Sequence, residues 1–181
     1  KILLRRDMTS TIGKELLKKL MGTTTPVQKV PVEKLNQYTD KNHQGAIAFL
    51  SPIDFCDVET LVPTLFEEGK TPLLMVLDGV TDVRNFGAIA RTCACAGADA
   101  LIIGSHGSVA INGDAVKTSA GALYHLPVCK VENMQNCLQF LRDSGFHVVA
   151  ATEHATQNYT DADMTAPTAI VMGSEEKGIY E

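Results

Sequence analysis

Polar residues that could contact a ligand follow two apolar segments of the sequence. In the first, Asn85 lies at the expected start of a helix rich in small residues, and Arg91 follows six residues later. An arginine is costly to bury without a partner. The sequence therefore leaves two interpretations of Arg91 open: it pairs with an acid inside the protein, or it faces an anionic substrate.

The second segment, 170–179, runs from an apolar strand into a turn bounded by Gly173 and Gly178, with Glu175 between them. A glycine at the start of such a turn lets a ligand approach the main chain closely. The turn is not a phosphate-binding P-loop, because Ile-Tyr rather than Lys-Ser/Thr follows the second glycine. No Gly-x-Gly-x-x-Gly follows any expected strand, so the dinucleotide-binding fingerprint is absent as well.

The sequence gives little support to metal or disulfide chemistry. The cysteines are odd in number and the Cys-x-Cys pair has no matching second pair, so a zinc site is not expected. The histidines share no metal-ligand spacing. Free cysteines in apolar segments act as small core residues. We therefore expect no metal, a reducing cytoplasm, and structural roles for Cys56, Cys93, Cys95, Cys129 and Cys137.

Strands and helices alternate through the second part of the chain, which predicts an α/β fold with a parallel sheet and right-handed crossovers. We expect strands at 73–77, 100–103, 126–130, 147–151 and 169–172, and helices at 86–96, 112–123 and 134–142. Ligands of open parallel sheets bind beyond the carboxyl ends of the strands. The loops that could hold one are therefore 78–85, 104–108, 151–155 and 173–178.

The first part of the chain predicts a smaller α/β unit. Its expected strands are 1–4, 27–30 and 46–50, and its expected helices are 13–21, 32–38 and 57–68. The short polar segment 67–72 contains Gly69 and Pro72, which favour a boundary there. We therefore expect two domains, residues 1–69 and 72–181.

The composition is globular, with 45% hydrophobic and 20% charged residues, and no apolar run reaches the ~18–20 residues of a membrane-spanning helix. Residues 1–41 carry 9 basic and 4 acidic side chains, a net of +5, whereas residues 42–181 carry 7 and 17, a net of −10. A basic end suits an anionic partner, although ordinary solvated helices would give the same charges. The chain begins with Lys1 rather than an initiator Met and stops at Glu181, just after a Gly-rich turn, so we expect it to be a piece of a longer protein. It shows no signal peptide.

Taken together, the two segments resemble a known family. Asn85-x-Gly87-x-x-x-Arg91 after a strand resembles motif 1 of the SpoU (TrmH-like) class of SPOUT methyltransferases, and Gly173-x-Glu175-x-x-Gly178 resembles motif 2. The segments 119–122 and 127–128 also look like family sequence. His43-Gln44-Gly45 before a strand resembles the small ribosomal-protein-like domain of many members. The likeness is closest to bacterial enzymes that methylate a guanosine ribose in 23S rRNA.

The resemblance implies a C-terminal SPOUT trefoil-knot domain with a parallel sheet and a small N-terminal ribosomal-protein-like α/β domain that binds the substrate. The family's third motif would follow Glu181, so we expect the knot-completing part to be missing from this chain. The implied reaction transfers a methyl group from S-adenosylmethionine to a ribose 2′-hydroxyl of RNA, without a metal. The implied assembly is a homodimer with the active site near its interface.

The resemblance also assigns roles to residues. Arg91 would hold RNA phosphate and stabilise charge on the 2′-oxygen, because a side chain with a pKa above ~12 is a poor base. Asn85 and Glu175 would orient the arginine and shape the site. The implied cofactor contacts are Ala151, Thr152, Glu153, Met172, Gly173, Ser174 and Gly178. The implied RNA contacts are Arg84 and Arg91 in the second domain, and Arg5, Arg6, Lys14, Lys18, Lys19, Lys41, His43 and Gln44 in the first.

Several alternatives stay open. His43 and Gln44 either contact RNA bases or only pin their turn. The substrate is rRNA or tRNA, of which the small domain favours rRNA. A non-catalytic RNA-binding module is compatible with residues 1–70, although the set of Asn85, Arg91 and Glu175 argues against it. A nucleotide-binding oxidoreductase or phosphatase is a further alternative. The chain has neither of the glycine fingerprints expected for these classes, and they leave Arg91 unexplained.

Overall fold

A computed structural model describes residues 1–7, 11–21, 23, 25–49 and 51–180, without the side chains of residues 11 and 12. The chain divides into two compact units, Lys1–Leu50 and Ser51–Glu181. This division precedes segment 67–72, where the sequence predicts the domain boundary. The helix α3 (Val58–Glu67) lies in the second unit because its buried Val58, Val62 and Leu65 pack into that unit's core.

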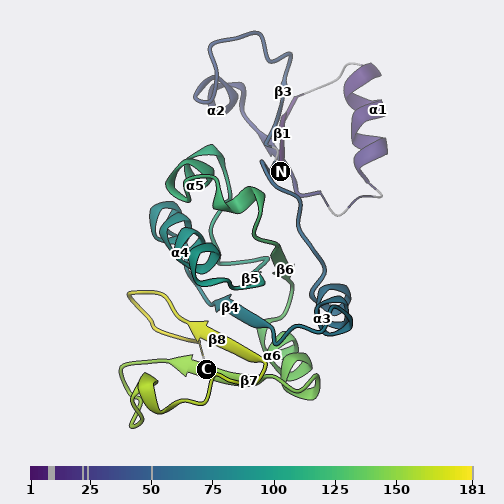
Figure 1. Ribbon diagram of the computed structural model, residues 1–181. Helices are drawn as coiled ribbons and strands as arrows, with labels where there is room; N and C mark the ends of the chain where they lie inside the picture. Colours follow the sequence, from purple (N-terminus) through teal and green to yellow (C-terminus); the bar gives the residue numbers. More distant parts are fainter. Residues whose placement is uncertain (8–10, 22, 24, 50, 181) are drawn as a thin grey trace. The chain divides into compact units, whose positions relative to one another are not determined.

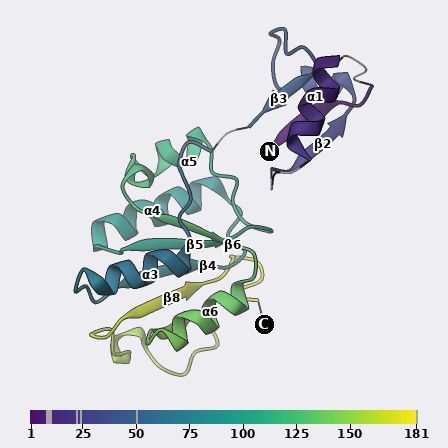
Figure 2. The same cartoon turned by 90° about the vertical axis from the view of Figure 1, so that its right-hand side faces the viewer.

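The first unit contains a three-stranded sheet of order β2-β1-β3, formed by β1 (Ile2–Arg5), β2 (Val27–Val30) and β3 (Ala46–Ala48). Strand β1 pairs parallel with β2 and antiparallel with β3. The helices α1 (Thr11–Leu20) and α2 (Val32–Asn36) lie on opposite sides of the strands (Figures 1 and 2). Leu3 and Leu4 are therefore both buried, although they are neighbours in one strand. The capping residues expected for α1 at Ser10 and Gly22 lie outside the described residues.

The second unit is built on five parallel strands, as the sequence predicts. Their order is β6-β5-β4-β8-β7, and every pairing is parallel. The strands β4 and β5 in the middle are apolar on both faces, as strands buried between two helical layers must be. The five strands are β4 (Leu73–Leu77), β5 (Ala100–Gly104), β6 (Val128–Val131), β7 (His147–Ala151) and β8 (Thr168–Met172).

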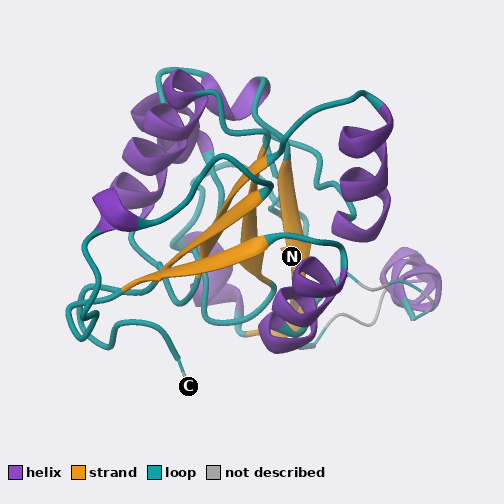
Figure 3. Cartoon of the chain, turned by 60° about the horizontal axis from the view of Figure 1, so that its bottom comes forward, coloured by secondary structure: helices purple, strands orange, loops and turns teal. Residues whose placement is uncertain are grey.

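Helices cover both faces of this sheet (Figure 3). On one face, α3 and α6 (Met134–Asp143) enclose a core that includes Val76, Ile102 and Val171. On the other face, α4 (Val83–Ala96), α5 (Gly113–Thr118) and the 3-10 turn η1 (Ala122–Tyr124) enclose a second core. A further 3-10 turn, η2 (Tyr159–Asp161), lies between β7 and β8. No helix among the described residues is long and apolar enough to cross a membrane.

The strand order reverses between β4 and β8. From β4 the chain steps outward through β5 to β6, then crosses to the far edge at β7 and returns to β4 through β8. Leu77 and Met172, the last residues of β4 and β8, are register partners. The loops after these strands therefore start side by side, at the kind of switch point where open α/β sheets bind ligands.

Candidate active site

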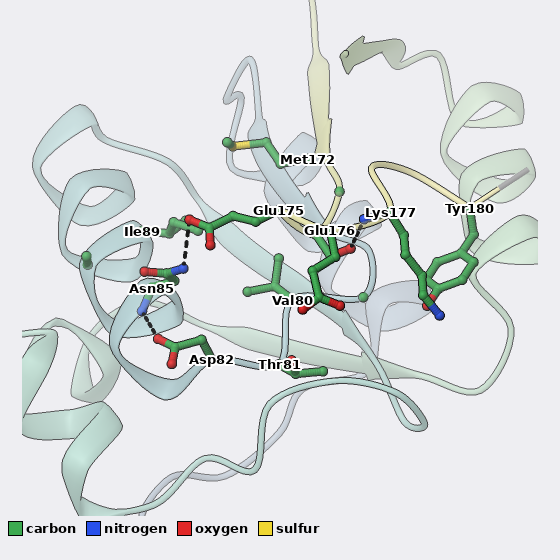
Figure 4. A pocket seen from close by; sticks show the side chains of 14 residues that line it. Val80, Thr81, Asp82, Asn85, Ile89, Met172, Glu175, Glu176, Lys177 and Tyr180 are labelled. Atoms are coloured by element: carbon green, nitrogen blue, oxygen red, sulfur yellow. Dashed lines mark hydrogen bonds between the residues drawn. The ribbon is translucent and has the colours of Figure 1, made fainter. Parts of the chain in front are cut away.

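A cavity of about 540 Å³ opens at this switch point. Of the described residues, those that line it come from segments 79–89 and 172–180, the loops that follow β4 and β8 (Figure 4). Its volume is within the usual range for small-molecule sites, about 300–1,000 Å³. Two of the four loops expected at this edge thus form the site, and they are the two that carry the predicted motifs.

The turn after β8 is closed by its own backbone. Ser174 N donates to Gly178 O over 3.0 Å, and Gly178 N donates back to Ser174 O over 2.9 Å. Lys177 N also donates to Ser174 Oγ at 3.1 Å. A Cβ on Gly173 would overlap the backbone of Gly178. Gly173 is therefore needed for the close approach of the chain's own backbone.

The helix α4 begins at Val83, three residues before its expected start at 86. The reason is Asp82, whose Oδ1 caps the helix by accepting from Arg84 N and Asn85 N, both at 2.8 Å. Asn85 is thus in the first helical turn rather than at its edge. Gly97, with φ of 77°, ends the helix as predicted.

The two predicted motifs meet at the cavity. Asn85 Nδ2 donates to Glu175 Oε1 at 3.3 Å (Figure 4). Both side chains are exposed and both line the cavity. This contact joins α4 to the turn after β8. The second carboxylate oxygen of Glu175 has no partner in the part of the chain that the structure describes, so it can accept from a ligand.

Arg91 does not line this cavity. Six residues at 100° each place it about 120° around the helix from Asn85, so the two side chains leave α4 in different directions. Arg91 is exposed, and its guanidinium has no ion-pair or hydrogen-bond partner among the described residues. The interpretation in which it pairs inside the protein is therefore wrong for this chain. Arg84, seven residues earlier, is exposed on the same side of the helix.

The predicted cofactor residues fall into two groups. Met172, Gly173 and Ser174 line the cavity, whereas Gly178 closes the turn behind it. The exposed residues Ala151, Thr152 and Glu153 do not line it. They follow β7, the strand paired with β8, and Ala151 is the register partner of Met172.

Sequence reasoning missed the apolar and aromatic part of the cavity. Val80, Ile89 and Tyr180 line it. Tyr180 N donates to Asp78 Oδ2 at 2.7 Å, and its ring lies against Gly79, where a Cβ would come within 2.7 Å of the ring. Ile89 could have been predicted, because it lies one helical turn after Asn85 and therefore on the same side of the helix.

In the first unit, His43 and Gln44 lie in the same turn and differ in their contacts. His43 Nδ1 accepts from Gly45 N, and its Nε2 lies against Asn36 Oδ1, both at 2.9 Å. His43 therefore pins the turn. Gln44 is exposed and held at φ of 51°, which is uncommon for a residue with a side chain. Arg6, Lys14, Lys18, Lys19 and Lys41 are exposed, and Arg5 pairs with Asp7 at 2.9 Å.

The cysteines are placed as core residues in three of five cases. Cys93, Cys129 and Cys137 are buried, whereas Cys56 and Cys95 are exposed, contrary to a core role for all five. Burial raises the pKa of the Cys129 thiol to about 12 and that of Cys137 to about 11. Such thiols remain protonated and are poor nucleophiles. Among the described residues, no group of three or more histidine, cysteine or acidic side chains could hold a metal.

The topology and the position of the cavity define an open-sheet α/β protein with a cavity at its switch point. Comparison with known proteins identifies the class. The sequence model of the SpoU rRNA Methylase family matches residues 72–181. A protein of Staphylococcus saprophyticus, provisionally named a TrmH family tRNA/rRNA methyltransferase, is 33% identical over 179 residues, which cover 99% of this chain and 72% of the relative.

Solved structures have the same fold. The SpoU methyltransferase AviRb from Streptomyces viridochromogenes, in complex with AdoMet, matches with a TM-score of 0.61 and 22% identity over 99% of this chain and 68% of that one. The A. aeolicus TrmH/SpoU tRNA modifying enzyme matches with a TM-score of 0.53 and 28% identity over 67% of this chain and 64% of that one. The chain belongs to the SpoU rRNA methylase family, the class of RNA methyltransferases that its motifs resemble. This membership excludes the oxidoreductase and phosphatase interpretations.

Methyltransferases of this family use S-adenosylmethionine. The cavity suits it chemically. Val80, Ile89 and Met172 offer apolar contact to a nucleoside, and the carboxylates of Glu175 and Glu176 favour a cationic sulfonium. The residues present therefore fit the cofactor at this edge of the sheet.

Proposed function

We propose that this protein transfers the methyl group of S-adenosylmethionine to a ribose 2′-hydroxyl of RNA. The observation that carries the proposal is the contact of Asn85 with Glu175 at the rim of the cavity. It brings the two motifs together at the ligand-binding edge of the sheet. The family supports methyl transfer to RNA, and the motifs support the ribose oxygen as the acceptor.

In this proposal the cofactor lies against Met172, Gly173 and Ser174, with Ala151, Thr152 and Glu153 at the neighbouring strand end. When bound, it supplies a methyl group already activated on a sulfonium. The acceptor ribose lies toward Asn85 and Glu175, which share the cavity. Holding the acceptor oxygen close to the methyl group lowers the entropic part of the barrier.

Arg91 serves the acceptor strand in this proposal. Its guanidinium is exposed and unpaired among the described residues, so it is available to a phosphate. Because Arg91 does not line the cavity of its own chain, we extend the proposal to a homodimer in which α4 lies near the interface. The trefoil knot and a cytoplasmic location belong to the same proposal.

The proposed substrate is 23S rRNA, with a guanosine as the modified nucleotide and the basic first unit as the part that holds RNA. A tRNA substrate is the alternative, supported by the tRNA modifying enzyme of A. aeolicus among the structural relatives. The test is methyl transfer from labelled S-adenosylmethionine to 23S rRNA and to tRNA, with mapping of the product. A 2′-O-methylated rRNA nucleoside is expected. Label on a base instead of a ribose, or in neither RNA, would reject the proposal.

A further inference from the structure

A second hollow adjoins the cavity. It has a volume of about 650 Å³ and lies between the first turn of α4 and the helix α5. Thr81 and Asp82 line both hollows, so the two hollows are neighbours at the loop before α4. Arg84 and Lys117 line the second hollow from the two helices. We name this second hollow the flanking groove.

Close packing of α4 against α5 sets the spacing between the backbone positions of Arg84 and Lys117, the two cations of the flanking groove. Gly87 lies so near α5 that a Cβ there would come within 2.7 Å of Thr118 Cβ and 3.0 Å of Ala115 O. This contact fixes α4 against α5 between Arg84 and Lys117. Both side chains are exposed, and neither has an ion-pair partner among the described residues.

The acidic residues of the groove do not cancel these charges. Asp82 Oδ1 accepts from two backbone amides at the positive end of α4, which offsets its charge. The exposed carboxylate of Asp114 is the remaining anion among the described residues of the groove. The hydroxyl of Thr81, which lines both hollows, has no hydrogen-bond partner among the described residues and can donate to a ligand. The groove thus offers two cations and a donor against one free carboxylate.

We propose that the flanking groove binds the phosphodiester backbone of the RNA strand next to the reacting nucleotide, through Arg84, Lys117 and Thr81. This inference rests on the proposed function, because a polynucleotide acceptor in the cavity must continue beyond it. Arginine and lysine at phosphates position a strand without reading its sequence. The groove therefore sets the register of the strand, and the target base is chosen elsewhere.

The test is the salt dependence of binding to a short single-stranded oligoribonucleotide. Arg84→Gln and Lys117→Gln should each weaken binding and reduce the slope of log affinity against log salt by about 0.7, the value for one phosphate contact of a single strand. Asp114→Asn should strengthen binding. Arg142→Gln is the matched control, because the exposed Arg142 lies on α6, across the sheet from the groove. Circular dichroism shows whether each variant is folded.

The inference would be overturned if the folded Arg84/Lys117 double variant kept the salt slope of the wild type. It would also be overturned if the Arg142 control lost as much of the salt slope, or if the wild-type chain did not bind RNA. The proposed function is tested separately, and it fails if the wild-type protein does not methylate ribose. Even in that case, a smaller salt slope in the Arg84 and Lys117 variants would still support RNA binding by the groove.

Discussion

Asn85 and Glu175 are 90 residues apart in the sequence, and their side chains are joined by a hydrogen bond of 3.3 Å. Parallel pairing of β4 and β8, with Leu77 opposite Met172, brings their loops together. The Asp82 cap then sets the first turn of α4, from which Asn85 reaches the turn after β8. The site is thus a consequence of strand order and of one helix cap.

Replacing Asn85 by Ala should reduce methyl transfer by about 100-fold, because Glu175 would lose the donor that orients it. Stability should change by no more than about 1 kcal/mol, since both side chains are exposed. Single-turnover methylation and thermal unfolding, measured on the same variant, check this. The Glu175→Gln variant keeps the shape of the side chain and removes its negative charge. Normal methyl transfer by both variants would show that Asn85 and Glu175 are not part of the active site.

Gly173→Ala should destabilise the protein by about 1–3 kcal/mol or more, because the added Cβ overlaps the backbone of Gly178. The measurement is chemical or thermal unfolding. Gly113→Ala is the matched control, since a Cβ at Gly113 meets no atom within 4 Å. We expect that control to stay within about 0.5 kcal/mol of the wild type. Equal stability of the two variants would show that the turn after β8 can open at little cost.

The sequence predicts the parallel sheet well because the apolar strands are short and bounded by polar turns. The expected ranges 73–77 and 147–151 coincide with β4 and β7. The expected helix starts at 32, 57, 112 and 134 agree with the structure to within one residue. The start of α4 was missed by three residues, since a cap such as Asp82 competes with other polar residues of the same loop. The order of the strands was not predicted, because it depends on long-range pairing that no local pattern encodes.

The site could be predicted only in part. The motifs indicated Asn85 and Glu175, and the structure joins them. The residues Val80, Ile89 and Tyr180 were missed because apolar side chains carry no chemical signature in a sequence. The angle between Arg91 and Asn85 around α4 follows from helix geometry. The role of Arg91 depends on what lies against α4 in the assembled enzyme, which the sequence does not reveal.

The buried thiols should resist alkylation. Because burial raises the pKa of Cys129 and Cys137 above the ordinary value of 9.0, iodoacetamide at pH 8 should label Cys56 and Cys95 first. Mass spectrometry of the native and denatured protein checks the order. The folded state holds these protons more tightly, so the stability they contribute is present below about pH 9 and falls as the pH rises toward about 11 and 12. Rapid native labelling of Cys129 would contradict this placement.

The exposed lysines of α1 should contact RNA phosphates. Changing Lys14, Lys18 and Lys19 to Gln should weaken RNA binding and flatten its salt dependence, while the affinity for S-adenosylmethionine stays the same. Lys18 and Lys19 also lie in the last turn of α1, where they favour the helix dipole, so helix content must be checked. Lys34→Gln on α2, across the strands, is the control. If the salt slope does not change, α1 faces solvent in the complex.

Arg91→Ala should remove nearly all methyl transfer and leave the protein folded. Loss of a buried ion pair would cost about 3–5 kcal/mol, but Arg91 is exposed and unpaired among the described residues, so the melting temperature should scarcely move. Arg91→Lys should restore little, because an ammonium lacks the planar fork that spans a phosphate and a hydroxyl. Cofactor affinity should be unchanged in both variants, since Arg91 does not line the cavity.

The deciding measurement is single-turnover methylation beside thermal unfolding. A destabilised variant whose folded fraction methylates at the normal rate would make Arg91 a structural residue. A stable variant with normal transfer would show that the exposed guanidinium serves neither the strand nor a partner subunit.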